Sequence, residues 1–568
     1  KKHLGEITCN HSNVIDPTDT QQWKELAEHS SELQVNSLKE LLLGDPSRLE
    51  DLSFRFNDRY PWGDFYIDFS KQKITKETLN RLVALAYELE LPKKINDLFN
   101  GETVNISENR PALHTALRGS KSSLDVERMI DAEFNRAYSF ADAVRLGTWR
   151  GATGKEISTV VNIGIGGSHL GPLMTTTALK GYSGWKGDFC FVSNIDPSDI
   201  VSKLVDLDPE STLFIINSKS FTTKETIKNA EIVIKWLQEH LGSEEEVLNK
   251  HLFAVTADAE KAARLGIHEK NIFTIWDWVG GRFSIFSSVS LVLMIALPKL
   301  QFRMLADGAR SIDNHFRSVD LSENIPVLMG LIGIWNRNFL GYENHAVLPY
   351  SEDLKYFPSY LEQLEMESNG KNTLQNGEKV TAHTSPIILG GIGTNAQHSF
   401  FQLLHQGTTI IPSDFIVFSV PPENTRYRAP KIFDQHEILV ANCFAQSKAL
   451  ALGSSHNSNH HDADGNRPST TILGKRLEPY TLGQLIAVYE HKVFTMGAIW
   501  NINSFDQEGV QLGKSIAEDI ENAISTTKDY SSYDPSTRSL LSIYDEWKIP
   551  PDNLDQVKKI PRRRDISK

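Results

Sequence analysis

In the first part of the chain, apolar residues recur at helical spacing among charged neighbours. Leu79, Leu82 and Leu85 form one such stripe, which predicts an amphipathic helix. Residues 58–69 are rich in aromatic side chains and predict a short turn or strand instead. We therefore expect residues 1–118 to form a mainly helical N-terminal region that serves as a scaffold.

From Ser158 onward, short apolar runs alternate with helical stretches. The runs expected to form strands are 159–165, 189–193, 213–216 and 252–256 in one half, and 346–349, 387–389 and 410–418 in the other. Such alternation is typical of βαβ units, in which helices cover a parallel sheet. We therefore predict an α/β fold with two α/β domains, 119–300 and 301–525, and a C-terminal extension, 526–568.

The segment Ser218–Thr226 lies between a predicted buried strand and a predicted helix, and it offers five hydroxyls and two lysines. The first amides of a helix have no partner within the helix, and its dipole is positive at that end, so an anion is favoured there. The simpler alternative is an ordinary helix N-cap, but a cap needs only one hydroxyl. This segment therefore predicts a binding site for a phosphate group.

Composition and charge limit the class of protein. The chain has 568 residues, 40% of them hydrophobic and 23% charged, as in an ordinary globular protein with two or more domains. Its net charge of -13 argues against binding to nucleic acid or to an anionic membrane. The basic stretch 558–564 is more simply interpreted as a solvated tail.

The three cysteines are far apart and form no C-x-x-C pair, so we expect free thiols in a reducing compartment and no zinc site. The start of the chain lacks the apolar core of a signal peptide. The most apolar run, 289–298, is about half the length that a membrane span needs. These features predict a cytoplasmic protein that does not enter the membrane.

Two glycine-rich stretches suggest nucleotide binding, but neither fits. In Gly164-Ile-Gly-Gly-Ser-His169 the third glycine of the dinucleotide fingerprint is replaced by His169. The stretch 509–515 is one residue too short for a P-loop and does not follow a strand. We therefore predict no nucleotide cofactor, although glycines after a strand still allow close approach of an anion. A stretch with a similar but shorter glycine pattern, 391–395, follows a predicted strand in the second half of the chain.

Two charged residues are candidates for chemistry. Arg282 follows two glycines, which gives its planar guanidinium an open approach to an oxyanion; an exposed arginine at a tight turn is equally consistent. Glu367 falls in the last turn of a helix that Asn369 and Gly370 should end, where the dipole favours a proton acceptor. Taken alone, a solvated helix-end glutamate is the simpler interpretation.

The stretch Thr394–Gln397 has a capping-box pattern, so His398 should lie in a first helical turn and stay neutral near pH 7. A packed core histidine is the simpler alternative.

Lys514 lies on a helix-like run and by itself indicates little. The segment 456–466 contains histidines and aspartates, but their spacing fits a solvent loop better than a metal site.

Several ordered blocks, taken together, resemble the glucose-6-phosphate isomerase family over nearly the whole chain. They include Asn162-Ile-Gly-Ile-Gly-Gly-Ser168, Asp277-Trp-Val-Gly-Gly-Arg282 and Met366-Glu-Ser-Asn-Gly-Lys371, and the others are 105–118, 218–226, 393–398, 465–469 and 505–514. The resemblance implies two sugar-isomerase domains, an aldose–ketose isomerase of glucose 6-phosphate and fructose 6-phosphate, and no cofactor or metal. It also implies a homodimer in which each active site takes a histidine from the partner.

The resemblance further implies which residues bind the substrate. Those expected to hold the phosphate are Ser218, Lys219, Ser220 and Thr223, helped by Gly167 and Ser168. Gln363 and Gln507 are expected to contact the sugar phosphate as well.

It also implies the catalytic groups. Glu367 matches the base that moves the proton between C2 and C1, and Arg282 the arginine that stabilises the enediolate. His398 matches the acid/base of ring opening, with Glu225 as its carboxylate partner. Lys514 is expected to assist at the ring and anomeric oxygens. The chemistry needs these same kinds of group: a base, a ring-opening acid and a cation for the oxyanion.

The chain departs from the family pattern at some positions. The loop 389–398 lacks a glutamate and a proline beside the histidine, with Gly391 and Ile392 in that stretch. The other departures are Ser220, Ser290, Glu508 and Gln511. None removes a proposed catalytic group, so we expect activity, at a reduced rate if the histidine loop is less rigid.

Two other functions were weighed against the isomerase. A sugar-phosphate-binding regulator on the same fold would keep the Ser218–Thr226 loop but lose the base or the acid. A transferase that uses ammonia from glutamine would need a separate amidase domain, for which the sequence shows no signal. The presence of Glu367, His398, Arg282 and Lys514 together favours the isomerase.

Overall fold

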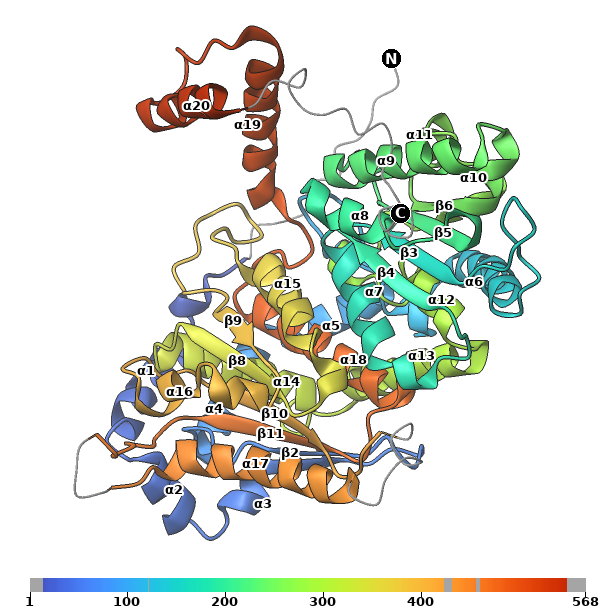
Figure 1. The fold of residues 1–568 in the computed structure, drawn as a ribbon. Coiled ribbons are helices and arrows are strands. Elements are labelled where there is room, and N and C mark those ends of the chain that lie inside the picture. The colour runs from blue at the N-terminus through green and yellow to red at the C-terminus, as the bar shows by residue number, and fades with distance from the viewer. Residues whose placement is uncertain (1–13, 121, 423–431, 456–459, 549–568) are drawn as a thin grey trace, which may run out of the picture.

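A computed structural model describes residues 14–120, 122–422, 432–455 and 460–548 of the chain. The described residues contain two sheets, each flanked by helices (Figure 1). The first sheet has five strands in the order β4-β3-β5-β6-β7, and the second has six in the order β1-β2-β11-β10-β8-β9. The predicted α/β fold is confirmed.

The first sheet is parallel throughout and lies in the first half of the chain. Its strands are β3 (Thr159–Ile163), β4 (Asp188–Val192), β5 (Thr212–Asn217), β6 (Leu252–Thr256) and β7 (Ile272–Thr274). Every residue of the central strand β5 is buried, because helices cover both faces of the sheet. This is why the strand reads as a continuous apolar run in the sequence. The short edge strand β7 was not predicted.

The helices of this half connect and cover the strands. They are α6 (Leu124–Arg145), α7 (Gly167–Ala178), α8 (Pro197–Leu204), α9 (Lys224–Leu241), α10 (Glu245–His251), α11 (Ala259–Arg264) and α12 (Leu291–Ala296). Both α7 and α9 follow a strand directly at its carboxyl end, so their N-termini face the edge where ligands of parallel sheets bind.

The second sheet draws strands from both ends of the chain. Its strands are β1 (Ser53–Phe56), β2 (Phe65–Asp68), β8 (Asn344–Pro349), β9 (Ile387–Gly390), β10 (Ser413–Phe418) and β11 (Ser469–Gly474). The hairpin β1–β2 lies at one edge, and β2 pairs antiparallel with β11, with Ile67 opposite Ile472. The N-terminal region therefore completes this sheet, which the sequence did not predict.

Four helices form the core between the sheets: α13 (Lys299–Ser318), α14 (Ile325–Ile334), α15 (Phe357–Asn369) and α18 (Pro479–Ile499). All residues of α18 are buried. A Cβ atom at Gly483 would lie 1.9 Å from the carbonyl oxygen of Leu305, so α13 and α18 touch through their backbones. Glycine at this position is what allows the two helices to pack so closely.

The remaining helices lie at the periphery. They are α1 (Gln21–Leu33), α2 (Leu38–Gly44), α3 (Arg48–Leu52), α4 (Lys76–Glu88), α5 (Leu91–Asn100), α16 (Phe401–Gln406), α17 (Ile432–Leu452), α19 (Gln511–Asn522) and α20 (Pro535–Trp547). The helices α1 to α5 agree with the predicted helical N-terminal region. The helices α19 and α20 project from the body as an arm (Figure 1). Within the described residues, no helix has the length and apolar character that crossing a membrane requires.

Candidate active site

A pocket of about 1090 Å³ opens at the carboxyl ends of the first sheet's strands. Its walls come from the turn after β3, the loop after β5, the turn 280–282, the end of α15 and the start of α19. Ligands of open parallel sheets bind at this edge. The pocket is therefore the candidate active site.

The loop after β5 is the predicted phosphate-binding segment. Ser218 is buried, and its hydroxyl donates to Thr223 Oγ1 at 3.3 Å; the hydroxyls of Ser220 and Thr222 lie 2.8 Å apart. Thr223 occupies the N-cap position of α9, yet its side chain makes no capping hydrogen bond within the described structure. The helix-cap alternative therefore does not account for these hydroxyls.

Lys219 ties this loop to the neighbouring segment of the pocket wall. Its Nζ donates to the carbonyl oxygens of Asp277 at 2.8 Å and Val279 at 3.0 Å. Burial lowers the pKa of this lysine below its usual value, and the charge of Asp277 opposes that shift. Lys219 lines the pocket while bracing the stretch that leads to Arg282.

The glycines after β3 allow two backbone segments to meet. Gly166 has φ +59°, a left-handed conformation that suits glycine, and α7 begins at Gly167. A Cβ atom at Gly167 would lie 2.2 Å from the carbonyl carbon of Gly281. The first turn of α7, which includes Ser168, therefore packs directly against the turn that carries Arg282.

Arg282 is almost fully buried, with 1% of its side chain exposed. Its Nε donates to Ser368 Oγ at 2.6 Å, and its Nη2 donates to the carbonyl oxygens of Ser504 at 2.6 Å and Asp506 at 3.0 Å. Burial lowers the pKa of the guanidinium, but the charges of Glu367 and Asp506 oppose this. The exposed-arginine alternative is therefore wrong, and Nη1 is the part of the group that faces pocket side chains.

Glu367 lies in the last turn of α15, as predicted. Its Oε2 accepts from Arg282 Nη1 at 3.3 Å and from Gln363 Nε2 at 3.0 Å. Its side chain is 28% exposed, toward the pocket that it lines. Gln507 Oε1 also accepts from Arg282 Nη1, at 3.1 Å. The carboxylate is thus held by specific partners rather than being a solvated helix-end glutamate.

The pocket lining includes most of the residues that the sequence singled out. They are Gly167, Ser168, Ser218, Lys219, Ser220, Thr223, Glu225, Arg282, Gln363, Glu367, Gln507 and Lys514. Glu225 comes from the first turn of α9, and Lys514 is an exposed residue of α19. Residues more than 300 positions apart in the sequence are therefore brought to one cavity.

His398 is the exception, because it is exposed and does not line this pocket. The predicted capping box is also wrong. Asn395–His398 form a four-residue 3-10 helix, and Thr394 makes no capping hydrogen bond with the described residues. The side chain of Gln397 instead accepts from Tyr350 Oη at 2.9 Å and donates to Asn442 Oδ1 at 3.1 Å. Tertiary contacts thus take the side chain that a capping box would use.

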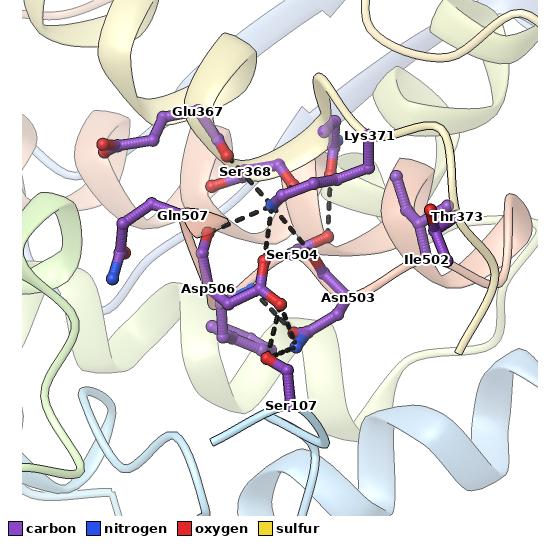
Figure 2. Close-up of polar contacts among 12 residues, drawn as sticks. Ser107, Glu367, Ser368, Lys371, Thr373, Ile502, Asn503, Ser504, Asp506 and Gln507 are labelled. Carbon is purple, nitrogen blue, oxygen red and sulfur yellow. Dashed lines mark hydrogen bonds and ion pairs between the residues drawn. The ribbon is translucent and has the colours of Figure 1, made fainter. Parts of the chain in front are cut away.

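Four polar residues behind the pocket were not assigned a role from the sequence: Ser368, Lys371, Ser504 and Asp506. Figure 2 shows them packed between the end of α15 and the loop 502–507. A lysine directly after a helix that ends in Asn-Gly is a recognisable signal, because cations bind helix-end carbonyl groups. The acceptors for Arg282 in the loop 502–507 gave no comparable signal.

A metal site was not predicted, and the described residues contain no group of three or more histidine, cysteine, aspartate or glutamate side chains that could hold a metal ion. The predicted solvent loop 456–466 lies partly outside the described residues.

Comparison with known proteins gives a consistent result. The family profile described as phosphoglucose isomerase matches residues 68–541. The glucose-6-phosphate isomerase of Frankia casuarinae is 46% identical over 550 residues, covering 93% of this chain and 97% of that protein. That of Deinococcus deserti is 45% identical over 548 residues, covering 93% and 99%. The crystal structure of a glucose-6-phosphate isomerase from Chlamydia trachomatis superposes with a TM-score of 0.83 at 34% identity, covering 94% of this chain and 100% of that one.

Proposed function

Since this chain belongs to the phosphoglucose isomerase family, we propose that its pocket interconverts glucose 6-phosphate and fructose 6-phosphate. The observation that carries the proposal is that a hydroxyl-rich loop at a helix N-terminus and a glutamate paired with a buried arginine line the same cavity. The first suits a phosphate dianion, and the second suits proton transfer beside a developing oxyanion.

Phosphate binding positions the sugar. We assign the phosphate to the hydroxyls of Ser218, Ser220 and Thr223 and to the N-terminal turns of α7 and α9. Gln363 and Gln507 would contact the sugar. The phosphate group does not react, but its binding orients C1 and C2 of the sugar against the catalytic residues. Binding energy at the phosphate is thereby used to raise the rate of the reaction at C1 and C2.

Proton transfer is assigned to Glu367. In the open-chain aldose, the carboxylate takes the proton from C2, the C2 electrons form the enediolate double bond, and O1 becomes the oxyanion. A proton then moves from O2 to O1, and return of the proton from Glu367 to C1, with formation of the C2 carbonyl, gives the ketose. Arg282 Nη1 would stabilise the enediolate, and the 3.3 Å contact between this atom and Glu367 Oε2 supports a shared reaction centre.

Ring opening is assigned to His398 of a second subunit, with Glu225 as its carboxylate partner and Lys514 near the ring and anomeric oxygens. Two observations support this assignment. No histidine of the described residues lines the pocket, and His398 is exposed on its own chain, where a neighbouring molecule can meet it. An imidazole is suited to this step because it exchanges protons near neutral pH.

A homodimer is therefore part of the proposal. The projecting arm exposes large apolar side chains, among them Leu512 (70%), Leu540 (67%) and Trp547 (76%). Apolar surface of this extent is typical of protein–protein contacts. Because the arm also carries Lys514, contact with a second copy would stabilise one wall of the pocket.

The domain division 119–300 and 301–525, with the extension 526–568, remains part of the proposal. Each proposed α/β domain contains most of one sheet. We also propose a cytoplasmic location, consistent with free thiols and a phosphorylated substrate.

The test is conversion of fructose 6-phosphate to glucose 6-phosphate by the purified chain, with EDTA present and no nucleotide in the reaction. Product is measured after quenching. We expect turnover in the ordinary range of about 1–10³ s⁻¹. Absence of turnover, with sugar phosphate still raising the unfolding temperature, would instead indicate a binding protein.

A further inference from the structure

Lys371 has no part in the mechanism proposed above, yet it is held in the wall behind the pocket. It directly follows Gly370, the C-cap of α15, and 17% of its side chain is exposed. Its Nζ donates to the carbonyl oxygens of Glu367 at 3.0 Å and Ser368 at 2.9 Å. Carbonyl groups in the last turn of a helix lack partners within the helix, so the ammonium group stabilises the turn that carries Glu367.

The same ammonium group also binds the loop 502–507. Its Nζ donates to the carbonyl oxygens of Asn503 at 2.9 Å and Asp506 at 3.0 Å, and it lies 3.1 Å from Asp506 Oδ1. Figure 2 shows Lys371 reaching from the end of α15 into this loop, while the side chains of Glu367 and Gln507 point away from it. One cation therefore joins two segments that each present a side chain to the pocket.

Arg282 binds the same two segments through neighbouring atoms. Lys371 binds the carbonyl oxygen of Ser368, whose hydroxyl accepts from Arg282 Nε. Both cations donate to the carbonyl oxygen of Asp506. Three of the four residues that Lys371 binds, Glu367, Ser368 and Asp506, therefore also accept hydrogen bonds from the guanidinium.

The carboxylate of Asp506 offsets the repulsion between the positive charges of Lys371 and Arg282. Its carboxylate lies beside Lys371, and its Oδ2 also accepts from Asn503 Nδ2 at 2.9 Å and from the hydroxyl of Ser107. Burial lowers the pKa of Lys371, the charge of Arg282 lowers it further, and the charge of Asp506 opposes both. Two neighbouring cations, one of them only partly exposed, therefore depend on the charge of Asp506 between the two segments.

We propose that Lys371 is a positioning residue that fixes Glu367, Arg282 and Gln507 relative to one another across the joint between α15 and the loop 502–507. The inference rests on the proposed roles of Glu367 and Arg282. Lys371 touches neither substrate nor reacting atoms in this proposal. Lys371 instead keeps the base Glu367 aligned with the oxyanion-binding group Arg282. A displacement of such groups by about 1 Å lowers the reaction rate by about 10²-fold.

The test is Lys371→Met, which keeps an unbranched side chain but removes the charge and all donors. We expect kcat for fructose 6-phosphate to fall by about 10²-fold in protein that is folded, while KM stays within about threefold. The phosphate-binding loop is not part of the joint, so affinity for inorganic phosphate as a competitive inhibitor should also change less than about threefold.

Arg48→Met is the matched control. Arg48 is a buried cation that likewise binds backbone carbonyl groups, those of Ser70, Gln72 and Ile74, but it does not line the pocket. Its loss should lower the unfolding temperature and leave kcat of the folded enzyme within about twofold. A fall in kcat of the same size in both variants would show that Lys371 only supports stability, and this would overturn the proposal.

A kcat within about threefold of the parent in folded Lys371→Met would also overturn it. If Lys371→Met does not fold, Asp506→Asn replaces it, because this variant keeps the four carbonyl contacts of Lys371 and removes the ion pair together with one of the two acceptor oxygens of the side chain. We expect about a tenfold loss of kcat with KM maintained, and an unchanged kcat would again refute the inference. If the parent chain itself shows no turnover, the proposed function fails and not the positioning role.

Discussion

Single residues of the site owe their properties to partners that are distant in sequence. Glu367 is held by Gln363 one turn earlier and by Arg282, which lies 85 positions away in the sequence. Arg282 in turn is surrounded by acceptors on its Nε and Nη2 atoms, so it cannot rotate away from the carboxylate without losing hydrogen bonds in a buried environment. Preorganisation of this kind is what lets a cation stabilise an oxyanion without reorganising during the reaction.

The role of Glu367 is tested by Glu367→Gln, which preserves size and hydrogen bonding but cannot accept the C2 proton. We expect loss of C1/C2 proton transfer by at least about 10²-fold, with sugar-phosphate affinity largely intact. Exchange of substrate hydrogen with solvent deuterium, followed by NMR, measures the step directly. Glu362→Gln, on the same helix but outside the pocket lining, is the control. Near-normal exchange in Glu367→Gln would exclude it as the base.

At the scale of elements, the site depends on how helix ends are placed. The N-termini of α7 and α9 face the pocket because each follows a parallel strand at its carboxyl end. The C-terminus of α15 meets the same pocket from the other side. Positive helix ends thus lie where phosphate is expected, and a negative helix end lies where the base is expected.

The contact between α7 and the turn at Gly281 is tested by Gly167→Ala. The new Cβ would lie 2.2–2.8 Å from backbone atoms of Gly281 and Arg282, so one of the two segments must move. We expect a loss of about 1–3 kcal/mol in the free energy of unfolding and a fall in kcat/KM.

Gly281→Ala is the matched control for stability, because its Cβ would meet only the Cα atom of Gly167, at 3.8 Å. Chemical denaturation of both variants measures the difference. Equal stability of the two variants would show that the close approach at Gly167 is not needed.

A second element-scale prediction concerns pH and the start of α14. His315, on α13, accepts the N–H of Ile325 through Nε2 at 3.0 Å, so its ring must be neutral there. Burial lowers the pKa of His315 to about 4, and the nearby His491 adds to that shift. Because the unfolded chain binds a proton at this residue below about pH 6.5 and the folded chain does not, stability present above pH 6.5 is lost as the pH falls toward 4.

We expect this residue to account for about 1–2 kcal/mol of the stability lost between pH 7 and pH 5. In His315→Gln, whose amide oxygen can accept the same N–H without titrating, that part of the loss should disappear. Urea denaturation of both proteins at the two pH values is the measurement. An unchanged difference between pH 7 and pH 5 would contradict the assignment.

At the scale of the whole molecule, buried polar contacts join regions that the sequence separates. Arg118, at the end of the N-terminal region, binds Asp313 on α13 and Glu490 on α18, with all three side chains at most 1% exposed. Its Nη2 lies 2.6 Å from Asp313 Oδ1. Removing one partner of such a buried network leaves an uncompensated charge, so the N-terminal region is firmly tied to the core helices.

The shared active site of the proposed dimer is testable at this scale. The variants Glu367→Gln and His398→Ala should each be inactive alone. A heterodimer, however, combines the intact Glu367 of one chain with the intact His398 of the other in one of its two sites. We expect random mixing to restore roughly a quarter of the parent activity. Absence of recovery, after tagged subunits are shown to have exchanged, would refute a histidine supplied by the partner.

The sequence by itself determined the features that have a local signature. The buried run of β5, the hydroxyl-rich loop after it and the helix that ends near Glu367 are set by spacing and by helix-ending residues within about a dozen positions. The order of the motifs was enough to indicate the family. The one local prediction that failed, the capping box at Thr394, failed because Tyr350 and Asn442 bind Gln397.

Only the tertiary structure decided which groups meet. The pairing of β2 with β11 and the contacts of Arg282 with Ser504 and Asp506 join residues some hundreds of positions apart. The role that we infer for Lys371 depends on the same kind of contact. Such pairings are selected by the packing of the whole core and leave no periodic pattern at either partner. For that reason the catalytic and binding residues could be anticipated from the sequence, but the contacts that hold them in place could not.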